Sequence, residues 1–172
     1  MKQYNGISII PGDDWCQIDA EISTDSSLDQ IGGYYNGRYF HALIPDEIKS
    51  QAKSINEREA FAVLVACRLW LGHLKRKNLL MHCDNESTVY ILNSGRSKCD
   101  FAQDVLREIR FLSAQNEARI RTDHIEGLNN RISDCLSRWD LDAKYRTEFF
   151  KLTSDDNLIE ETADCSLPVH YW

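Results

Sequence analysis

The chain has 172 residues, of which 42% are hydrophobic and 27% are charged, and its formal net charge is -7. This composition is typical of globular proteins and unlike disordered, collagen-like or membrane-embedded chains, and the length suits one domain with a tail. Because no apolar run approaches the roughly 18 residues of a membrane span, we expect an intracellular protein of the cytoplasm or nucleus, neither secreted nor bound to a membrane.

Acidic residues gather toward the C-terminus. Residues 140–172 hold eight acids and three bases, which leaves a net charge of only -2 for residues 1–139. Lys75, Arg76 and Lys77, or Arg96 with Lys98, could form a local basic strip, although a solvated helix end is the alternative for the first cluster. The overall negative charge therefore does not exclude a nucleic-acid partner.

The six cysteines are scattered along the chain. They form no CxxC pair and have no paired histidines nearby, so the ligand spacing of zinc sites is missing. We expect reduced thiols, mostly in the core.

The first third of the chain is predicted to form three strands. Residues 15–24 alternate between apolar and polar side chains, as a strand does, and Asp25 follows directly. Asn36-Gly37 separates two aromatic-rich runs, which predicts an antiparallel hairpin of strands near 31–35 and 38–43, closed by Pro45.

The middle of the chain is predicted to alternate helices with a strand. Residues 53–74 predict a largely buried helix that starts with a capping box, either Ser54 with Glu57 or Asn56 with Glu59. Residues 78–83 predict a short buried strand, and residues 86–93 a short helix that stops at Gly95.

The last third predicts helices around one further strand. Residues 100–116 place apolar side chains on one helical face, with Asp100 and Gln103 as a possible capping box. Residues 118–125 alternate as a strand, 131–139 form a short helix, and 143–152 form one more helix. Residues 153–172 are expected to be a loose acidic tail or a linker. The order predicts an α/β fold with a mixed five-stranded sheet and helices on both faces.

Two acids are expected where parallel strands end. Asp25 follows the first predicted strand and Asp84 the fourth, and ligands of such sheets bind beyond the carboxyl ends of the strands. If these strands are neighbours, the two carboxylates lie side by side. Asp84 could instead cap the following helix, or Asn85 could do so.

Two further acids lie at the rims of apolar elements: Glu59 in the first turn of the buried helix and Asp134 at the start of the last short helix. Singly, each of these acids is more often a cap or a solvated charge. Four carboxylates brought together repel one another unless cations neutralise them. Mg²⁺ does this in phosphodiester chemistry, with two ions about 3.5–4 Å apart.

Four segments in this order resemble the ribonuclease H domain of reverse transcriptases, especially that of DIRS-type (tyrosine-recombinase) retrotransposons. They are "STDSSLDQIGGYY", "SINEREAFAVL", "MHCDNESTVYILNSG" and "DHIEGLNNRISDCLSRW", and they span about residues 14–140. Gln30, Ser26 and Ser133 depart from the family pattern in small ways. Cellular members also have a histidine in the loop before the last helix; here that loop has none, and His124 lies on the preceding strand.

The resemblance implies a ribonuclease H-like fold with strand order 3-2-1-4-5, in which strands 1–3 are antiparallel and strands 1, 4 and 5 parallel. The domain would cover residues 14–140, with an N-terminal extension at 1–13 and a C-terminal helix and acidic tail at 141–172. The implied activity is hydrolysis of the RNA strand of RNA–DNA hybrids during retrotransposon reverse transcription.

Carried over by residue, the resemblance makes Asp25, Glu59, Asp84 and Asp134 the catalytic, metal-binding acids, with Asp19 and Glu57 as competitors for the first two positions. Two Mg²⁺ ions would be the cofactors, with Mn²⁺ as a possible substitute and no small-molecule cofactor. Ser26, Asn56 and Asn85 are the expected substrate-binding residues.

The expected partners are an RNA–DNA hybrid and an adjacent reverse transcriptase domain of a polyprotein. The latter follows because a basic handle for gripping the hybrid is not evident in the sequence. A catalytically inactive module of this fold, or a DNA-cutting nuclease of the same superfamily, are the alternatives.

Overall fold

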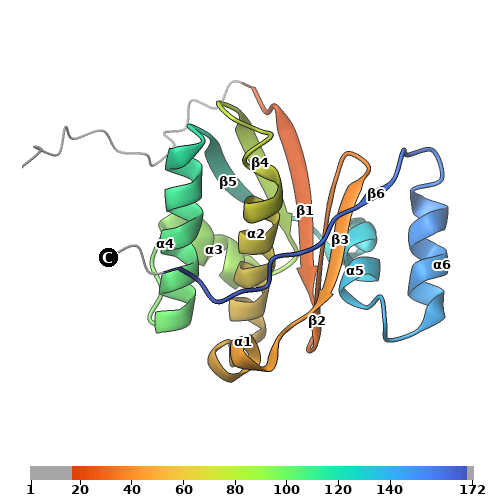
Figure 1. Cartoon of the computed structure of the whole chain (residues 1–172), viewed down its shortest axis with the longest axis horizontal. Coiled ribbons are helices and arrows are strands. Elements are labelled where there is room, and N and C mark those ends of the chain that lie inside the picture. The colour runs from red at the N-terminus through yellow and green to blue at the C-terminus, as the bar shows by residue number, and fades with distance from the viewer. Residues whose placement is uncertain (1–16, 170–172) are drawn as a thin grey trace, which may run out of the picture.

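The computed structural model describes residues 17–169, which form one mixed sheet with helices on both faces (Figure 1). The strand order is β5-β4-β1-β2-β3-β6. The strands are β1 (Ala20–Ser26), β2 (Gln30–Tyr35), β3 (Arg38–Leu43), β4 (Asn78–Cys83), β5 (Arg119–His124) and β6 (Ile159–Glu160). The N-terminal extension expected at residues 1–13 lies outside the described residues, as does Cys16.

The five predicted strands are present in the predicted relative order. β1, β2 and β3 are antiparallel neighbours, while β4 and β5 run parallel to β1. The prediction of a five-stranded sheet is nevertheless wrong, because β6 adds a sixth strand parallel to β3. β6 has only two residues, too few to show an alternating pattern.

The first strand begins later than predicted. β1 starts at Ala20 and includes Asp25, so Asp25 lies within the strand rather than after it. Ile18, expected on the buried side of the strand, precedes β1 and is 44% exposed. The β2–β3 hairpin forms as predicted, with positive φ at Asn36 (46°) and Gly37 (81°), as this tight turn requires.

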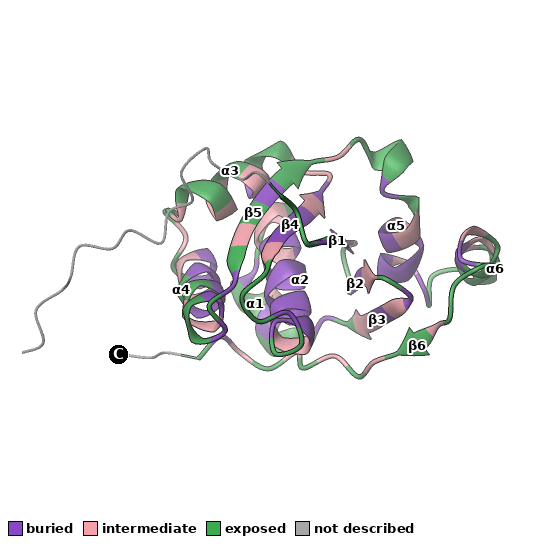
Figure 2. Cartoon of the chain, turned by 90° about the horizontal axis from the view of Figure 1, so that it is seen from above, coloured by how far each residue is buried: buried purple, intermediate pink, exposed green. Residues whose placement is uncertain are grey.

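Helices lie on both sides of the sheet (Figure 2). The α-helices are α1 (Asp46–Gln51), α2 (Ile55–Trp70), α3 (Glu86–Ser94), α4 (Asp100–Gln115), α5 (Arg131–Ser137) and α6 (Ala143–Leu152), with a 3-10 turn at Gly127–Asn129. α2 packs on one face of β1 and β2 and is flanked by α4; α5 packs on the opposite face and is flanked by α6. α1 was not predicted from the sequence.

Helix ends follow local side-chain chemistry. The Ser54–Glu57 capping box at the start of α2 is confirmed, with the Glu57 N–H donating to Ser54 Oγ and the Ser54 N–H donating to Glu57 Oε2. The capping box predicted from Asp100 and Gln103 is wrong: Cys99 is the N-cap of α4 and makes no side-chain cap bond. α3 ends at Gly95 as predicted, with φ 66°.

The core lies mainly between α2 and the sheet, where ten residues of α2 are buried. Three of the five described cysteines are buried there or beneath α5 (Cys67, Cys83 and Cys135), and Cys99 and Cys165 are partly exposed. All five are free thiols, as predicted.

The segment after α6 is not the loose tail that we expected. Residues 161–169, here called the strap, cross α2 and approach α4, and Ala163, Cys165 and Leu167 pack against the core (Figure 1). The strap closes around a buried ion pair between Arg68 of α2 and Glu108 of α4, whose side chains are 8% and 3% exposed.

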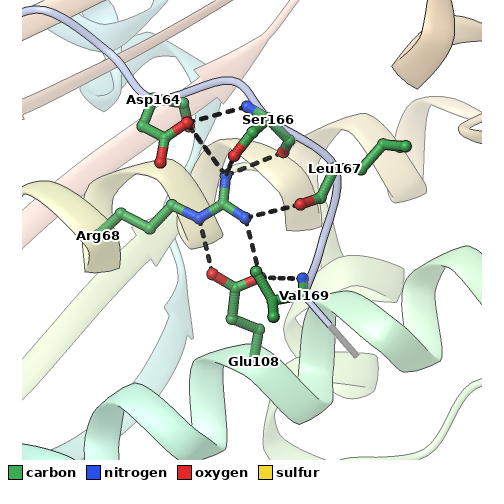
Figure 3. A network of polar contacts seen from close by, with 6 residues as sticks. All are labelled: Arg68, Glu108, Asp164, Ser166, Leu167 and Val169. Carbon is green, nitrogen blue, oxygen red and sulfur yellow. Dashed lines mark hydrogen bonds and ion pairs between the residues drawn. The ribbon is translucent and has the colours of Figure 1, made fainter. Parts of the chain in front are cut away.

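The Arg68 guanidinium holds both Glu108 and the strap backbone (Figure 3). Its Nε and Nη2 donate to the two Glu108 carboxylate oxygens at 2.7 and 2.8 Å, and its remaining contacts include the carbonyl oxygens of Asp164, Ser166 and Leu167. The Val169 N–H donates to Glu108 Oε2 at 2.8 Å. Apolar residues of the strap alternate with polar ones over residues 163–167, but this pattern is too short and too weakly apolar to distinguish the strap from a loose tail.

Candidate active site

Asp25 and Asp84 are carried by neighbouring parallel strands. Asp25 is the penultimate residue of β1, and Asp84 directly follows β4. The β1–β4 register pairs Ser23 with His82, so its continuation by two residues sets Asp25 opposite Asp84. The expected meeting of these two acids at the carboxyl end of the sheet is therefore present.

Glu59 enters the same place from α2. It is the fifth residue of the helix, one turn later than predicted, and only 3% exposed. Its Oε2 accepts a hydrogen bond from the Cys83 thiol at 3.3 Å. Ligand atoms of Glu59, Cys83 and Asp84 all lie within 4.8 Å of one another.

Asp134 reaches the cluster from α5, on the other face of the sheet. It is half-buried, and its Oδ1 pairs with Arg138 Nη2 at 3.0 Å, one turn along the helix. The charge of Asp134 acts on Asp25, and the charge of Asp84 acts on Asp134. The four acids thus form one electrostatically coupled group.

Burial and mutual repulsion shift the pKa values of these acids. The pKa of Asp25 rises from 3.8 to about 6, chiefly through burial, with the charges of Asp84 and Asp134 adding to the rise and the Ser137 hydrogen bond opposing it. The pKa of Glu59 rises from 4.5 to about 9, again chiefly through burial and then through Asp25 and Asp84. Burial also raises the pKa of Asp134. Each rise in pKa means that the ionised carboxylate is disfavoured in the metal-free site, and a bound cation would favour that ionised form.

The donor set fits a hard cation such as Mg²⁺. Ligand atoms of Glu59 and Asp84 lie within 4.8 Å of each other, while Asp25 and Asp134 interact with them through charge but lie outside that cluster. Oxygen is the ligand type that Mg²⁺ prefers. Cys83 lies close enough to count as a ligand by distance, but burial raises the pKa of its thiol, which instead donates to Glu59. The carboxylates close enough to share a cation are therefore Glu59 and Asp84, and Asp25 and Asp134 are coupled to them by charge.

Two of the three expected substrate-binding residues lie together. Asn85 Nδ2 donates to Asn56 Oδ1 at 2.8 Å, which joins the start of α3 to the start of α2. Asn85 Oδ1 also caps α3 by accepting the Thr88 N–H, so Asn85, not Asp84, is the cap. Ser26 is 7% exposed and donates to the Ser27 carbonyl, which leaves its hydroxyl oxygen free only to accept.

The competing acids have other partners. Asp19 precedes the opposite end of β1, where it accepts the Asn78 N–H at 2.8 Å, and Glu57 belongs to the α2 capping box. His124 ends β5, and its Nε2 lies 3.2 Å from the Asp84 carbonyl oxygen. His124 therefore contacts the backbone of the site rather than a carboxylate.

Sequence reasoning missed two residues that touch the acids, Cys83 and Ser137. The Ser137 hydroxyl makes a buried hydrogen bond to Asp25 Oδ2. The available signal was its place three residues after Asp134 on one helical face. A pocket of about 280 Å³ beside Asp134 was also missed; its lining includes Arg131, Lys144 and Tyr145 from α5 and α6.

Neither models of known protein families nor curated proteins match this chain. Within residues 17–169, no helix has both the length and the apolar character needed to cross a bilayer.

Proposed function

We propose that this chain is a metal-dependent endonuclease of ribonuclease H-like fold that hydrolyses the RNA strand of RNA–DNA hybrids. The observation that carries the proposal is that Asp25, Glu59, Asp84 and Asp134, from four separate parts of the chain, form one electrostatically coupled group. Capping and surface solvation do not account for this grouping, since Asn85 caps α3 and two of the four acids are almost fully buried. The sequence motifs around these acids, which resemble those of reverse transcriptases, support the same substrate.

The acids would divide the work by position. Bound Mg²⁺ would lower the pKa of the attacking water and stabilise the departing 3′ oxygen. Asp25 would contact both ions. Glu59 and Asp84 would hold the leaving-group side, and Asp134 the water side. Arg138, paired with Asp134, sets the orientation of that carboxylate.

Selection of RNA would depend on contacts to 2′-hydroxyl groups across a wide, shallow minor groove. The Asn56–Asn85 pair lies at the N-terminal ends of α2 and α3, beside Glu59 and Asp84 in the chain, and it presents amide donors and acceptors at the rim of the site. Ser26 would contribute as an acceptor. The basic side chains that line the pocket beside Asp134 already have acidic neighbours: Arg131 pairs with Glu148, and Lys144 lies 4.0 Å from Asp142. They are therefore poorly placed to bind nucleic acid, and we propose that an adjacent polymerase domain supplies further contacts to the hybrid.

The test is cleavage of an end-labelled RNA–DNA hybrid beside matched double-stranded DNA and double-stranded RNA, with Mg²⁺, with Mn²⁺ and with chelator. We expect cutting of the hybrid's RNA strand alone, lost with chelator and lost about 100-fold or more in Asp84→Asn, because residues that only support a metal ligand already cost about 10–100-fold when mutated and Asp84 would be a ligand itself. Asp19→Asn is the matched control, since it alters an acid at the other end of β1, and it should keep full activity.

Three results would redirect the proposal. Cutting of DNA duplex would favour a DNA nuclease of the same superfamily. Tight hybrid binding without cutting would favour an inactive binding module. Full activity of Asp84→Asn would show that the metal site is wrongly assigned.

A further inference from the structure

The face of α5 that meets β1 is polar, although it is buried. Asn130, Ser133 and Ser137 recur at helical spacing and are 2%, 0% and 0% exposed. Each bonds a different consecutive residue of β1: Asn130 Nδ2 donates to the Thr24 carbonyl at 3.0 Å, Ser133 Oγ shares a 2.7 Å bond with Ser23 Oγ, and Ser137 bonds Asp25. A buried polar face needs such partners, because unpaired polar groups are costly to desolvate.

Ser137 is the member of this face that touches an acid. Its hydroxyl donates to Asp25 Oδ2, and the same oxygen lies 3.0 Å from the carbonyl oxygen of Asp134, one turn back on its own helix. One small side chain therefore lies between the backbone that carries Asp134 and the carboxylate of Asp25. Asp25 and Asp134 are 109 positions apart in the sequence, and the Ser137 side chain links them in space.

Gly32 permits this close approach. It pairs with Asp25 in the β1–β2 ladder. A Cβ atom at Gly32 would lie 2.3 Å from Leu136 Cβ and 2.7 Å from the backbone N of Ser137. Any side chain at this position would push α5 away from β1 and lengthen the bond from Ser137 to Asp25.

We propose that Ser137 is a positioning residue of the candidate active site: its hydroxyl orients the Asp25 carboxylate toward Asp134, so that both acids serve the same cation. This inference rests on the proposed metal site. It assigns no contact between Ser137 and substrate. The hydroxyl acts through Asp25 alone.

The test compares Ser137→Ala with Ser133→Ala. Both variants remove one fully buried hydroxyl from the same face of α5, but only the Ser137 hydroxyl contacts a carboxylate. Isothermal titration with Mg²⁺ alone measures cation affinity without substrate, and urea unfolding measures the stability that each variant loses. Cleavage kinetics then separate kcat from the KM for the hybrid.

We expect both variants to lose stability, and Ser137→Ala to lose the more, because its hydroxyl bonds a charged group and that of Ser133 bonds a neutral serine. Mg²⁺ affinity should fall about 10-fold or more in Ser137→Ala only. A hydrogen bond to a charged group contributes enough free energy to change an equilibrium constant by about 10-fold or more. The KM for the hybrid should stay unchanged. Ser137→Thr disturbs the packing but keeps the hydroxyl, and it should bind Mg²⁺ much as the wild type does.

Equal Mg²⁺ affinity in Ser137→Ala and Ser133→Ala would overturn the inference, as would a Ser137→Thr variant as weak as Ser137→Ala. Neither result would affect the nuclease proposal if the wild type cuts hybrids. Conversely, selective loss of Mg²⁺ affinity in Ser137→Ala, in a protein that cuts no nucleic acid, would keep the inference and overturn the proposed function. A wild type that binds no Mg²⁺ would overturn both.

Discussion

Asp25 and Glu59 differ in protonation at neutral pH. With pKa values of about 6 and about 9, Asp25 is ionised at pH 7 and Glu59 keeps its proton in the metal-free protein. Glu59 is then an uncharged carboxylic acid, and the Cys83 thiol beside it is also neutral. A cation that binds the site must therefore displace a proton from Glu59, so cation binding and pH are linked.

This linkage predicts how the metal-free protein responds to pH. Both acids have a folded-state pKa above the ordinary value, so the folded state binds more protons than the unfolded state between pH 4 and 9. The free energy of unfolding should therefore fall as pH rises through this window. Mg²⁺ should raise the melting temperature, and by more at pH 8 than at pH 6, because fewer protons then oppose binding.

Urea unfolding across pH 4–9, with chelator and with Mg²⁺, measures both effects. Glu59→Gln is the control, since it removes the group with the larger shift; its metal-free profile should be flatter above pH 6. A wild-type profile that is flat in the same range would show that Glu59 is not held in its neutral form.

At the scale of elements, the position of α5 depends on the absence of a side chain at Gly32. The backbone of Leu136 and Ser137 occupies the space where a Cβ would be. The glycine is therefore required by a close approach between a helix and a strand, while its φ is of the ordinary negative kind. This explains in physical terms why a small residue precedes Gly33 in the segment "QIGGYY".

Gly32→Ala should lower the free energy of unfolding by about 1–3 kcal/mol, the usual cost of overpacking, and should weaken Mg²⁺ binding by moving α5. Gly72→Ala is the matched control, because a Cβ there meets nothing within 4 Å. It should be neutral or slightly stabilising. Equal stability of the two variants in urea unfolding would contradict the packing argument.

Elements with a strong local pattern were predictable from the sequence. The Asn36-Gly37 hairpin, the Ser54–Glu57 capping box and the stop at Gly95 each depend on a few adjacent residues. Asp25 and Asp84 were placed correctly relative to each other because parallel strands align their ends. Ser137 and Cys83 were missed as site residues, since their roles depend on contacts across 112 and 24 positions of sequence.

At the scale of the whole molecule, the strap joins the end of the described chain to the two helices that cover one face of the sheet. The packing of the strap was not predictable from the sequence, for a physical reason. Arg68 bonds three strap carbonyl groups, and Glu108 accepts one strap N–H; these backbone groups exist in every sequence. The side-chain signal was confined to two ordinary charged residues within helices and to a short, weakly apolar alternation over residues 163–167.

Glu108→Gln should destabilise the protein by about 3 kcal/mol, because removing one partner of a buried ion pair costs roughly 3–5 kcal/mol and the amide keeps some hydrogen bonding. Glu117→Gln is the control: it breaks the Arg76–Glu117 pair, whose side chains are 78% and 65% exposed. That loss should be at most about 1 kcal/mol. Urea unfolding of both variants measures the difference, and equal small losses would mean that the strap adds little.

The bond between Ser137 and Asp25 also has a consequence for the timing of synthesis. The two residues are 112 positions apart. At typical rates of about 5–20 residues per second, a ribosome needs roughly 6 to 22 s to reach Ser137 after it has added Asp25. Throughout this interval the nascent chain holds Asp25, and later Glu59 and Asp84, without the helix that completes the group. Any nuclease activity of this site would therefore begin only after α5 has left the ribosome, so a chain interrupted before that point would be released without it.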